Sequence, residues 1–254
     1  MAGTLYLVPT PIGNLNDISP RCARTLAEAD FIAAEDTRVS LKLLNHLEIK
    51  KSLVSYHEHN KAESGEKILA RLLAGETCAL VTDAGSPAIS DPGEDLVRLC
   101  AENGVTVCAI PGPCALVTAL SISGLPTGRF TFEGFLSVNK KSRQEHLTGL
   151  KDETRTMIFY EAPHKLLATL RDLADAFGED RKISLCRELT KLHEEVRRMT
   201  LGETPRRAAS LCSLWRARRK KRTRAAHLKR RTIWSAHAWR RDFPRRTLSS
   251  RSRS

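Results

Sequence analysis

Short apolar runs rich in β-branched residues alternate with amphipathic stretches over residues 1–200. In the first half of the chain, the runs expected to be strands are residues 5–8, 31–34, 53–56, 78–82 and 105–110. Ser19 and Pro20 form a helix-start signal, and a second helix is expected from Glu94 to the stop signal at Asn103 and Gly104. Strands and helices that alternate in this way predict an α/β fold.

A second unit is predicted after the turn at residues 124–128, with strands at 130–136, 157–160 and 183–186. Its clearest helix pattern runs from Pro163 to Gly178, where Leu166, Leu170 and Phe177 share one face. We therefore expect two α/β domains. The N-terminal domain comprises residues 1–122, and the C-terminal domain, which is expected to be incomplete, comprises residues 123–200. An atypical Arg-rich tail, residues 201–254, follows them.

Residues 103–128 carry no charged side chain, a composition that could suggest a membrane span. The Pro111-Gly112-Pro113 sequence divides the segment into a strand-like half and a helix-like half, each too short to cross a bilayer. The sequence therefore predicts that this segment is buried core and that the protein has no membrane partner.

The formal net charge of +13 is concentrated at one end of the chain. Residues 201–254 contain 18 Lys and Arg against 2 Asp and Glu, whereas residues 1–200 contain 24 against 27. Hydrophobic periodicity ends near Met199, yet all three tryptophans follow it. Two interpretations remain open for the tail: the product of a shifted reading frame, or a basic RNA-binding extension.

The seven cysteines contain no CxxC pair, and they are interpreted as reduced, mostly buried thiols. The N-terminus has no basic segment followed by an apolar one, so no export signal is expected. Both features favour a cytoplasmic protein.

Three loops rich in Pro and Gly follow predicted strands: a first loop at residues 9–15, a second at 83–93 and a third at 110–115. Open α/β sheets bind ligands at the carboxyl ends of their strands. Pro and Gly would fix the backbone paths so that main-chain groups face a ligand, with Asp83 and Ser86 adding polar side chains. None of the loops is a GxGxxG or P-loop, so a pyrophosphate site is not indicated.

Seven motifs within and around these loops occur in an order typical of one family. They read LVPTPIGNL, AAEDTR, LVTDAGSPAISDPG, IPGPCALVTALSISGLP, FEGFL, IFYEAPHK and RELTK. Over residues 3–199 the chain resembles the ribosomal RNA small subunit methyltransferase I family of the tetrapyrrole methylase superfamily. The resemblance implies two α/β domains with a cofactor cleft between them, and a homodimer.

The resemblance also implies 2′-O-methylation of a cytidine ribose (cytidine 1402) in the decoding centre of 16S rRNA within the 30S subunit. The cofactor implied is S-adenosylmethionine. Its contacts are carried by motif to Pro11, Gly85, Ser86, Pro87, Ile89, Cys114, Ala115, Tyr160 and Glu161. The family's usual C-terminal strands have no counterpart beyond residues 201–203, which puts cofactor affinity, dimer stability and activity in question for this chain.

Transfer of a methyl group to a ribose hydroxyl requires in-line positioning and an acceptor for the hydroxyl proton. The candidates for acid–base chemistry are Glu35, Asp36, His57, His59, Glu133, Glu161 and Lys191, and Arg38 completes a catalytic group with Glu35 and Asp36. The alternative for Glu35–Arg38 is a helix cap, with Asp36 or Thr37 capping a helix from Val39. Two histidines two residues apart, without a third ligand nearby, do not predict a metal site.

RNA contacts are assigned to Lys140, Lys141 and Arg143, with Arg38 as a further cation, because backbone recognition needs positive charge. The alternative for residues 140–143 is a solvated surface run. DNA is not expected as a partner. Two rival functions remain: a tetrapyrrole (precorrin-type) methyltransferase of the same fold, and an inactive RNA-binding protein acting through its tail.

Overall fold

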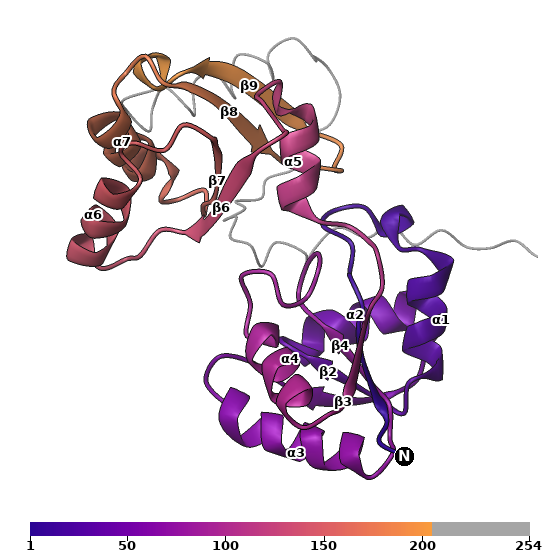
Figure 1. Cartoon of the computed structure of the whole chain (residues 1–254). Helices are drawn as coiled ribbons and strands as arrows, with labels where there is room; N and C mark the ends of the chain where they lie inside the picture. Colours follow the sequence, from indigo (N-terminus) through magenta and orange to yellow (C-terminus); the bar gives the residue numbers. More distant parts are fainter. Residues whose placement is uncertain (205–254) are drawn as a thin grey trace, which may run out of the picture.

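The computed structural model describes residues 1–204. Both interpretations of the tail, and Cys212, concern residues outside that part. A parallel five-stranded sheet forms the first unit, with the strand order β3-β2-β4-β1-β5. Figure 1 labels β2, β3 and β4 of this sheet. Its strands are β1 (Thr4–Leu7), β2 (Phe31–Ala34), β3 (Ser52–Ser55), β4 (Cys78–Val81) and β5 (Thr106–Ala109). All five predicted strands of the first half are confirmed within one or two residues of their ends.

Helices cover both faces of this sheet, because β2 and β4 are apolar at every position and need protection on both sides. The helices are α1 (Pro20–Glu28), α2 (Thr37–His46), α3 (Lys61–Leu73) and α4 (Gly93–Glu102). One apolar cluster joins the sheet to α3 and α4 through residues such as Ile68 and Leu96. The other joins it to α1 and α2 through Leu26 and Leu44.

The predicted helix signals are confirmed. The Ser19 side chain accepts a hydrogen bond from the backbone N–H of Cys22, and Pro20 occupies the first helical position. Helix α4 ends at Glu102, with Asn103 as its C-cap.

The second unit comprises residues 130–204 and joins the first through α5 (Ala115–Ser123) (Figure 1). Its elements are β6 (Phe130–Phe135), α6 (Lys140–Gly149), β7 (Thr156–Tyr160), α7 (Leu166–Phe177), β8 (Lys182–Arg187) and β9 (Glu195–Thr200). Strands β6 and β7 form a parallel pair, and β8 and β9 form an antiparallel pair. The proposed limits of the two domains stay predictions.

Two expectations from the sequence are wrong. Most of residues 103–128 is not buried core: Pro111 and Gly112 are exposed, and Val117 is 54% exposed. The reason is that β5 is an edge strand and that α5 packs on one side only, against β8 and β9 of the second unit (Figure 1). The helix expected from Pro163 begins at Leu166, because residues 163–165 form a turn in which the Lys165 N–H donates to the Ala162 carbonyl.

Within residues 1–204, no helix has the length and apolar character needed to cross a membrane.

Candidate functional site

The three Pro/Gly loops leave three neighbouring strands of the sheet. The first loop follows β1, the second follows β4 and the third follows β5, and the sheet places β1 between the other two. Since all strands are parallel, the loops emerge side by side at one edge. The sequence predicted the loops but not that their strands are adjacent.

Hydrogen bonds join the three loops to one another. Thr10 and Gly85 exchange two backbone bonds of 2.9 and 3.0 Å, which link the first loop to the second. The Ser86 hydroxyl donates to the Pro113 carbonyl at 3.0 Å, which links the second loop to the third. The loops therefore form one continuous rim rather than three independent turns.

Glycines allow these loops to approach each other closely. Gly85 has a φ of 91°, a conformation unfavourable for other residues, and a Cβ there would lie 3.3 Å from Ile12 Cγ2. A Cβ on Gly112 would lie only 2.7 Å from Pro9 Cβ. Pro11 and Pro87 are buried beneath the rim, whereas Ile89 is 43% exposed.

The far end of the second loop has a strained backbone. Ala88 and Ser90 have φ values of 65° and 66°, which are uncommon for residues other than glycine. Asp91 holds this shape, because its Oδ1 accepts hydrogen bonds from the N–H groups of Ala88 and Gly93. Its Oδ2 is buried without a hydrogen-bond partner, and burial raises the pKa of Asp91.

Residues of the second unit reach each of the three loops. A Cβ on Gly13 would lie 2.6 Å from Lys191 Cγ, so the first loop lies against the β8–β9 turn. A Cβ on Gly134 would lie 3.4 Å from Ser90 Oγ, which places β6 beside the second loop. Tyr160, at the end of β7, accepts a hydrogen bond from the Leu116 N–H, just beyond the third loop.

Tyr160 lies in an aromatic group beside Cys114 and Ala115, the residues where the third loop enters α5. Its ring packs edge-on against Phe132 and Phe135, at centroid distances of 4.9 and 5.5 Å. Burial raises the pKa of Tyr160, so its hydroxyl stays neutral and hydrogen-bonded. The N-cap residue of α5, Cys114, makes no side-chain hydrogen bond to the helix, and in this first turn Tyr160 accepts only the Leu116 N–H. The Ala115 and Val117 N–H groups are left as donors to a ligand.

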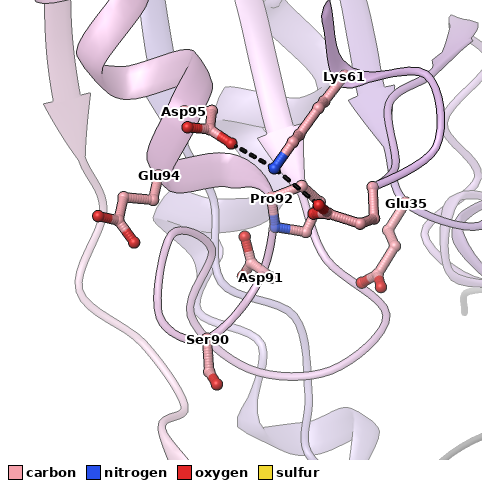
Figure 2. Close-up of a pocket in the computed structure, with 8 residues that line it drawn as sticks. Glu35, Lys61, Ser90, Asp91, Pro92, Glu94 and Asp95 are labelled. Atoms are coloured by element: carbon pink, nitrogen blue, oxygen red, sulfur yellow. Dashed lines mark ion pairs between the residues drawn. The ribbon is translucent and has the colours of Figure 1, made fainter.

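Glu35 borders a cavity of about 450 Å³ beside the second loop (Figure 2). Its Oε2 accepts a hydrogen bond of 2.8 Å from the Thr82 hydroxyl, which fixes the carboxylate at the carboxyl end of β2. The lining is rich in carboxylates and also includes one lysine; its residues are Glu35, Glu58, Lys61, Ser90, Asp91, Pro92, Glu94 and Asp95. Lys61 donates to Asp95 and Glu58, and these hydrogen bonds raise its pKa.

Asp36 caps α2, as the alternative interpretation held. Its Oδ1 accepts from the Arg38 N–H at 2.9 Å, although the helix begins at Thr37 rather than Val39. The same carboxylate binds the Arg38 guanidinium through two bonds of 3.0 and 2.9 Å, while the Arg38 side chain stays 73% exposed. The Asp36 carboxylate therefore accepts hydrogen bonds from the backbone at the start of α2 and from the Arg38 guanidinium. Glu35 is the carboxylate of this group that lines the cavity.

The remaining candidates lie in separate places. His57 and His59 have ring centroids 6.0 Å apart, and within residues 1–204 no group of three His, Cys, Asp or Glu side chains is arranged to hold a metal ion. Glu133 binds His146 at 2.9 Å, and Lys191 lies 3.6 Å from Glu188. The described cysteines have no disulfide partners: Cys22, Cys78 and Cys100 are buried, and Cys108, Cys114 and Cys186 are half-buried.

The predicted RNA-contacting cations differ in exposure. Lys140 and Lys141 are exposed in the first turn of α6, and the Lys141 side chain is 87% exposed. Arg143 is only 14% exposed, and it binds Asp172 and Thr169 in α7. Glu161 bonds to the same Thr169, so a predicted RNA contact and a predicted cofactor contact belong to one network.

Sequence reasoning missed Asp91, Thr82 and Lys61 as parts of the site. Asp91 belongs to a quoted motif, and its place before a Pro-Gly pair at a helix start was an available signal. Thr82 lies in the same motif, but neither its position nor that of Lys61 indicated a role, because their roles depend on which strands and helices are neighbours.

Comparisons with known proteins agree with this geometry. Residues 4–205 match the family model described as Tetrapyrrole (Corrin/Porphyrin) Methylases. The ribosomal RNA small subunit methyltransferase I of Synechocystis sp. is 54% identical over 199 residues, covering 78% of this chain and 71% of the relative. That of Halalkalibacterium halodurans is 56% identical over 201 residues, covering 79% and 69%.

Among solved structures, a uroporphyrin-III C-methyltransferase from Thermus thermophilus complexed with S-adenyl homocysteine shares the fold. Its TM-score is 0.55 at 20% identity, covering 81% of this chain and 94% of that one. The predicted fold class and the resemblance are confirmed. The chain belongs to the tetrapyrrole methylase family and, within it, to the ribosomal RNA small subunit methyltransferase I enzymes.

Proposed function

We propose that this enzyme uses S-adenosylmethionine to methylate the 2′-hydroxyl of a cytidine ribose, cytidine 1402, in the decoding centre of 16S rRNA within the 30S subunit. The observation that carries the proposal is the continuous rim made by the hydrogen-bonded loops after β4, β1 and β5. The names of the relatives support the rRNA substrate, and the S-adenyl homocysteine complex of the Thermus protein supports the cofactor class.

The rim suits a ligand that is polar at its ends and apolar along its length. Fixed backbone groups lie beside exposed apolar side chains, such as Ile89 and Val117, and beside the first turn of α5. We assign the cofactor contacts to Pro11, Gly85, Ser86, Pro87, Ile89, Cys114, Ala115, Tyr160 and Glu161. When bound, S-adenosylmethionine would supply an electrophilic methyl group on its sulfonium sulfur.

Glu35 is assigned as the group that accepts the 2′-hydroxyl proton as the methyl–oxygen bond forms. Its carboxylate faces the cavity and is oriented by the Thr82 hydroxyl. Asp36 holds Arg38 by a bidentate ion pair, which fixes an exposed guanidinium at the start of α2. Within this group, Asp36 and Arg38 orient the substrate and Glu35 takes the proton.

The charges around the cavity suggest how RNA would enter. Carboxylates line the cavity and would repel phosphate, so uncharged ribose or base would enter while phosphates stay outside near Arg38. The exposed Lys140 and Lys141 are assigned to phosphate contacts at the second unit. Arg143, the third predicted RNA contact, is largely buried and bonded to α7. We propose a cytoplasmic homodimer that binds neither DNA nor membranes.

One experiment separates the proposed function from its rivals. Full-length protein is incubated with labelled S-adenosylmethionine and either undermethylated 30S subunits or a precorrin. We expect label in rRNA ribose. Label in the tetrapyrrole would instead identify a tetrapyrrole methyltransferase, and salt-sensitive RNA binding without transfer would identify an inactive RNA-binding protein.

The role of Glu35 has its own test. Glu35→Gln should lower kcat about 100-fold or more with little change in KM for RNA, because only the proton acceptor is removed. Glu94→Gln is the matched control, since Glu94 borders the same cavity as an exposed residue. Equal kcat for Glu35→Gln and wild type would exclude Glu35 as the base.

A further inference from the structure

Arg143 connects two helices to the end of a strand. It lies in the first turn of α6, and its Nε donates to Asp172 Oδ2 at 2.5 Å while its Nη2 donates to Thr169 Oγ1 at 2.7 Å. Both partners lie on α7, three residues apart and therefore on one face of that helix. Figure 1 shows α6 and α7 as neighbours in the second unit.

Thr169 bonds to both Arg143 and Glu161 and so links the two side chains. The Thr169 side chain is buried, with 3% of the residue exposed, and its hydroxyl bonds to Glu161 Oε2. Since a guanidinium has only donors, Thr169 must accept from Arg143 and give its single proton to the Glu161 carboxylate. The other oxygen, Glu161 Oε1, accepts from the Ala162 N–H at 2.7 Å.

Glu161 directly follows Tyr160, which is anchored to α5 at the third loop. The Tyr160 hydroxyl accepts the Leu116 N–H at 2.9 Å, one residue after Ala115. A carboxylate fixed on both oxygens thus lies next to a side chain that touches the rim of the proposed cofactor site.

We infer that Arg143 is a positioning residue, which acts through Thr169 to orient Glu161 at the S-adenosylmethionine site, rather than a contact to RNA phosphate. The inference rests on the proposed function. The alternative, in which Arg143 contacts RNA phosphate, fits its environment poorly. The Arg143 side chain is 14% exposed and bonded to two partners, whereas the Lys141 side chain in the same helix turn is 87% exposed. Phosphate binding requires an accessible cation, and Lys141 meets that requirement better.

The test compares two substitutions at Thr169 in the full-length chain, with S-adenosylhomocysteine as the calorimetric probe. Thr169→Val removes the hydroxyl at nearly constant volume, and Thr169→Ser keeps it. Affinity should fall about tenfold in Thr169→Val and stay within about twofold of wild type in Thr169→Ser. Equal affinities for the two variants would overturn the inference, because a merely packing role would not depend on the hydroxyl.

A second measurement separates positioning from RNA contact. Arg143→Met should weaken S-adenosylhomocysteine binding about as much as Thr169→Val, and leave the salt dependence of binding to a decoding-region RNA fragment unchanged. Lys141→Met should do the reverse, lowering the slope of log K against log salt by about one. A lowered slope in Arg143→Met with unchanged probe affinity would make Arg143 an RNA ligand.

Controls keep the outcomes distinct. Lys151→Met removes an exposed cation just after α6 and should change neither quantity. Thermal unfolding of each variant identifies any that fail to fold, and the Thr169 pair still decides if Arg143→Met is one of them. Failure of wild-type protein to bind the probe would reject the proposed function itself, whereas binding that is insensitive to Thr169 would reject only this inference.

Discussion

Strands β2 and β4 of the first unit are buried at every residue, whereas β7, β8 and β9 of the second unit contain no buried residue. Both apolar clusters found within residues 1–204 belong to the first unit. In the second unit, single apolar side chains such as Leu147 and Leu170 are buried without forming such a cluster, and ion pairs and hydrogen bonds join the elements as well. Arg187 and Arg197 both bind Glu195, and Arg198 binds the carbonyls that end α5.

This difference in packing indicates that the first unit provides most of the folding stability and that the second unit positions side chains. Apolar burial contributes the larger share of folding free energy, so the first unit can support strained loops at its sheet edge. Polar networks contribute less net stability but define geometry, which suits a unit that holds Tyr160 against the end of the third loop and fixes the neighbouring Glu161.

The largest expected effect tests whether stability resides in the first unit. Leu96→Ala in α4 should lower the free energy of unfolding by about 4 kcal/mol, because Leu96 is fully buried between α4 and the sheet. The same change at Leu170 in α7 should cost about 2 kcal/mol, since Leu170 is buried but belongs to neither apolar cluster. Urea denaturation followed by circular dichroism measures both, and a larger loss at Leu170 would reverse the comparison.

An intermediate effect on stability is expected from removing the hydrogen bonds that Arg198 makes to α5. The Arg198 guanidinium donates to the Ser123 carbonyl at 2.9 Å and to the Ile122 carbonyl at 2.5 Å, which joins β9 to the end of α5. Arg198→Met should destabilise the protein by about 2 kcal/mol and increase proteolysis of the second unit before the first. Lys182→Met, an exposed cation on the neighbouring strand, is the control and should have little effect.

The smallest effect concerns pH. Hydrogen bonds from Arg155 lower the pKa of Glu153 to about 2. Burial opposes ionisation of Glu195, but Arg197 and Arg187 outweigh it and lower its pKa as well. Carboxyls with lowered pKa values stabilise the fold above the ordinary value of 4.5 and lose that contribution as pH falls toward 2.

Carboxyls of the first unit also have lowered pKa values: Asp30, Glu63, Glu76 and Asp95. We still expect the second unit to loosen first on acidification, because the apolar clusters of the first unit do not titrate. Hydrogen exchange measured between pH 5 and 3, over β8–β9 and over β2–β4, compares the two units. Simultaneous loss of protection in both would show that they unfold as one body.

Much of the fold could be predicted from local patterns, because buried strands such as β2 and β4 are continuous apolar runs. Strand β9 was missed, since its sequence EVRRMT mixes charged and apolar residues and pairs only with β8. The loops of the site were found from their Pro and Gly content. The network of Arg143 was not, because nothing local indicates that α6 would pack beside α7.

The order of the strands in the sheet also determines when each part of the protein can fold during synthesis. Strand β1 is the first to be made, yet its neighbours β4 and β5 end at Val81 and Ala109. At about 5–20 residues per second, β1 waits roughly 5–20 s for its second neighbour. Gly13, just beyond β1, meets Lys191 only after the β8–β9 turn has emerged. A nascent chain thus completes its sheet well before its site, and premature termination between these points would leave a folded unit without catalytic geometry.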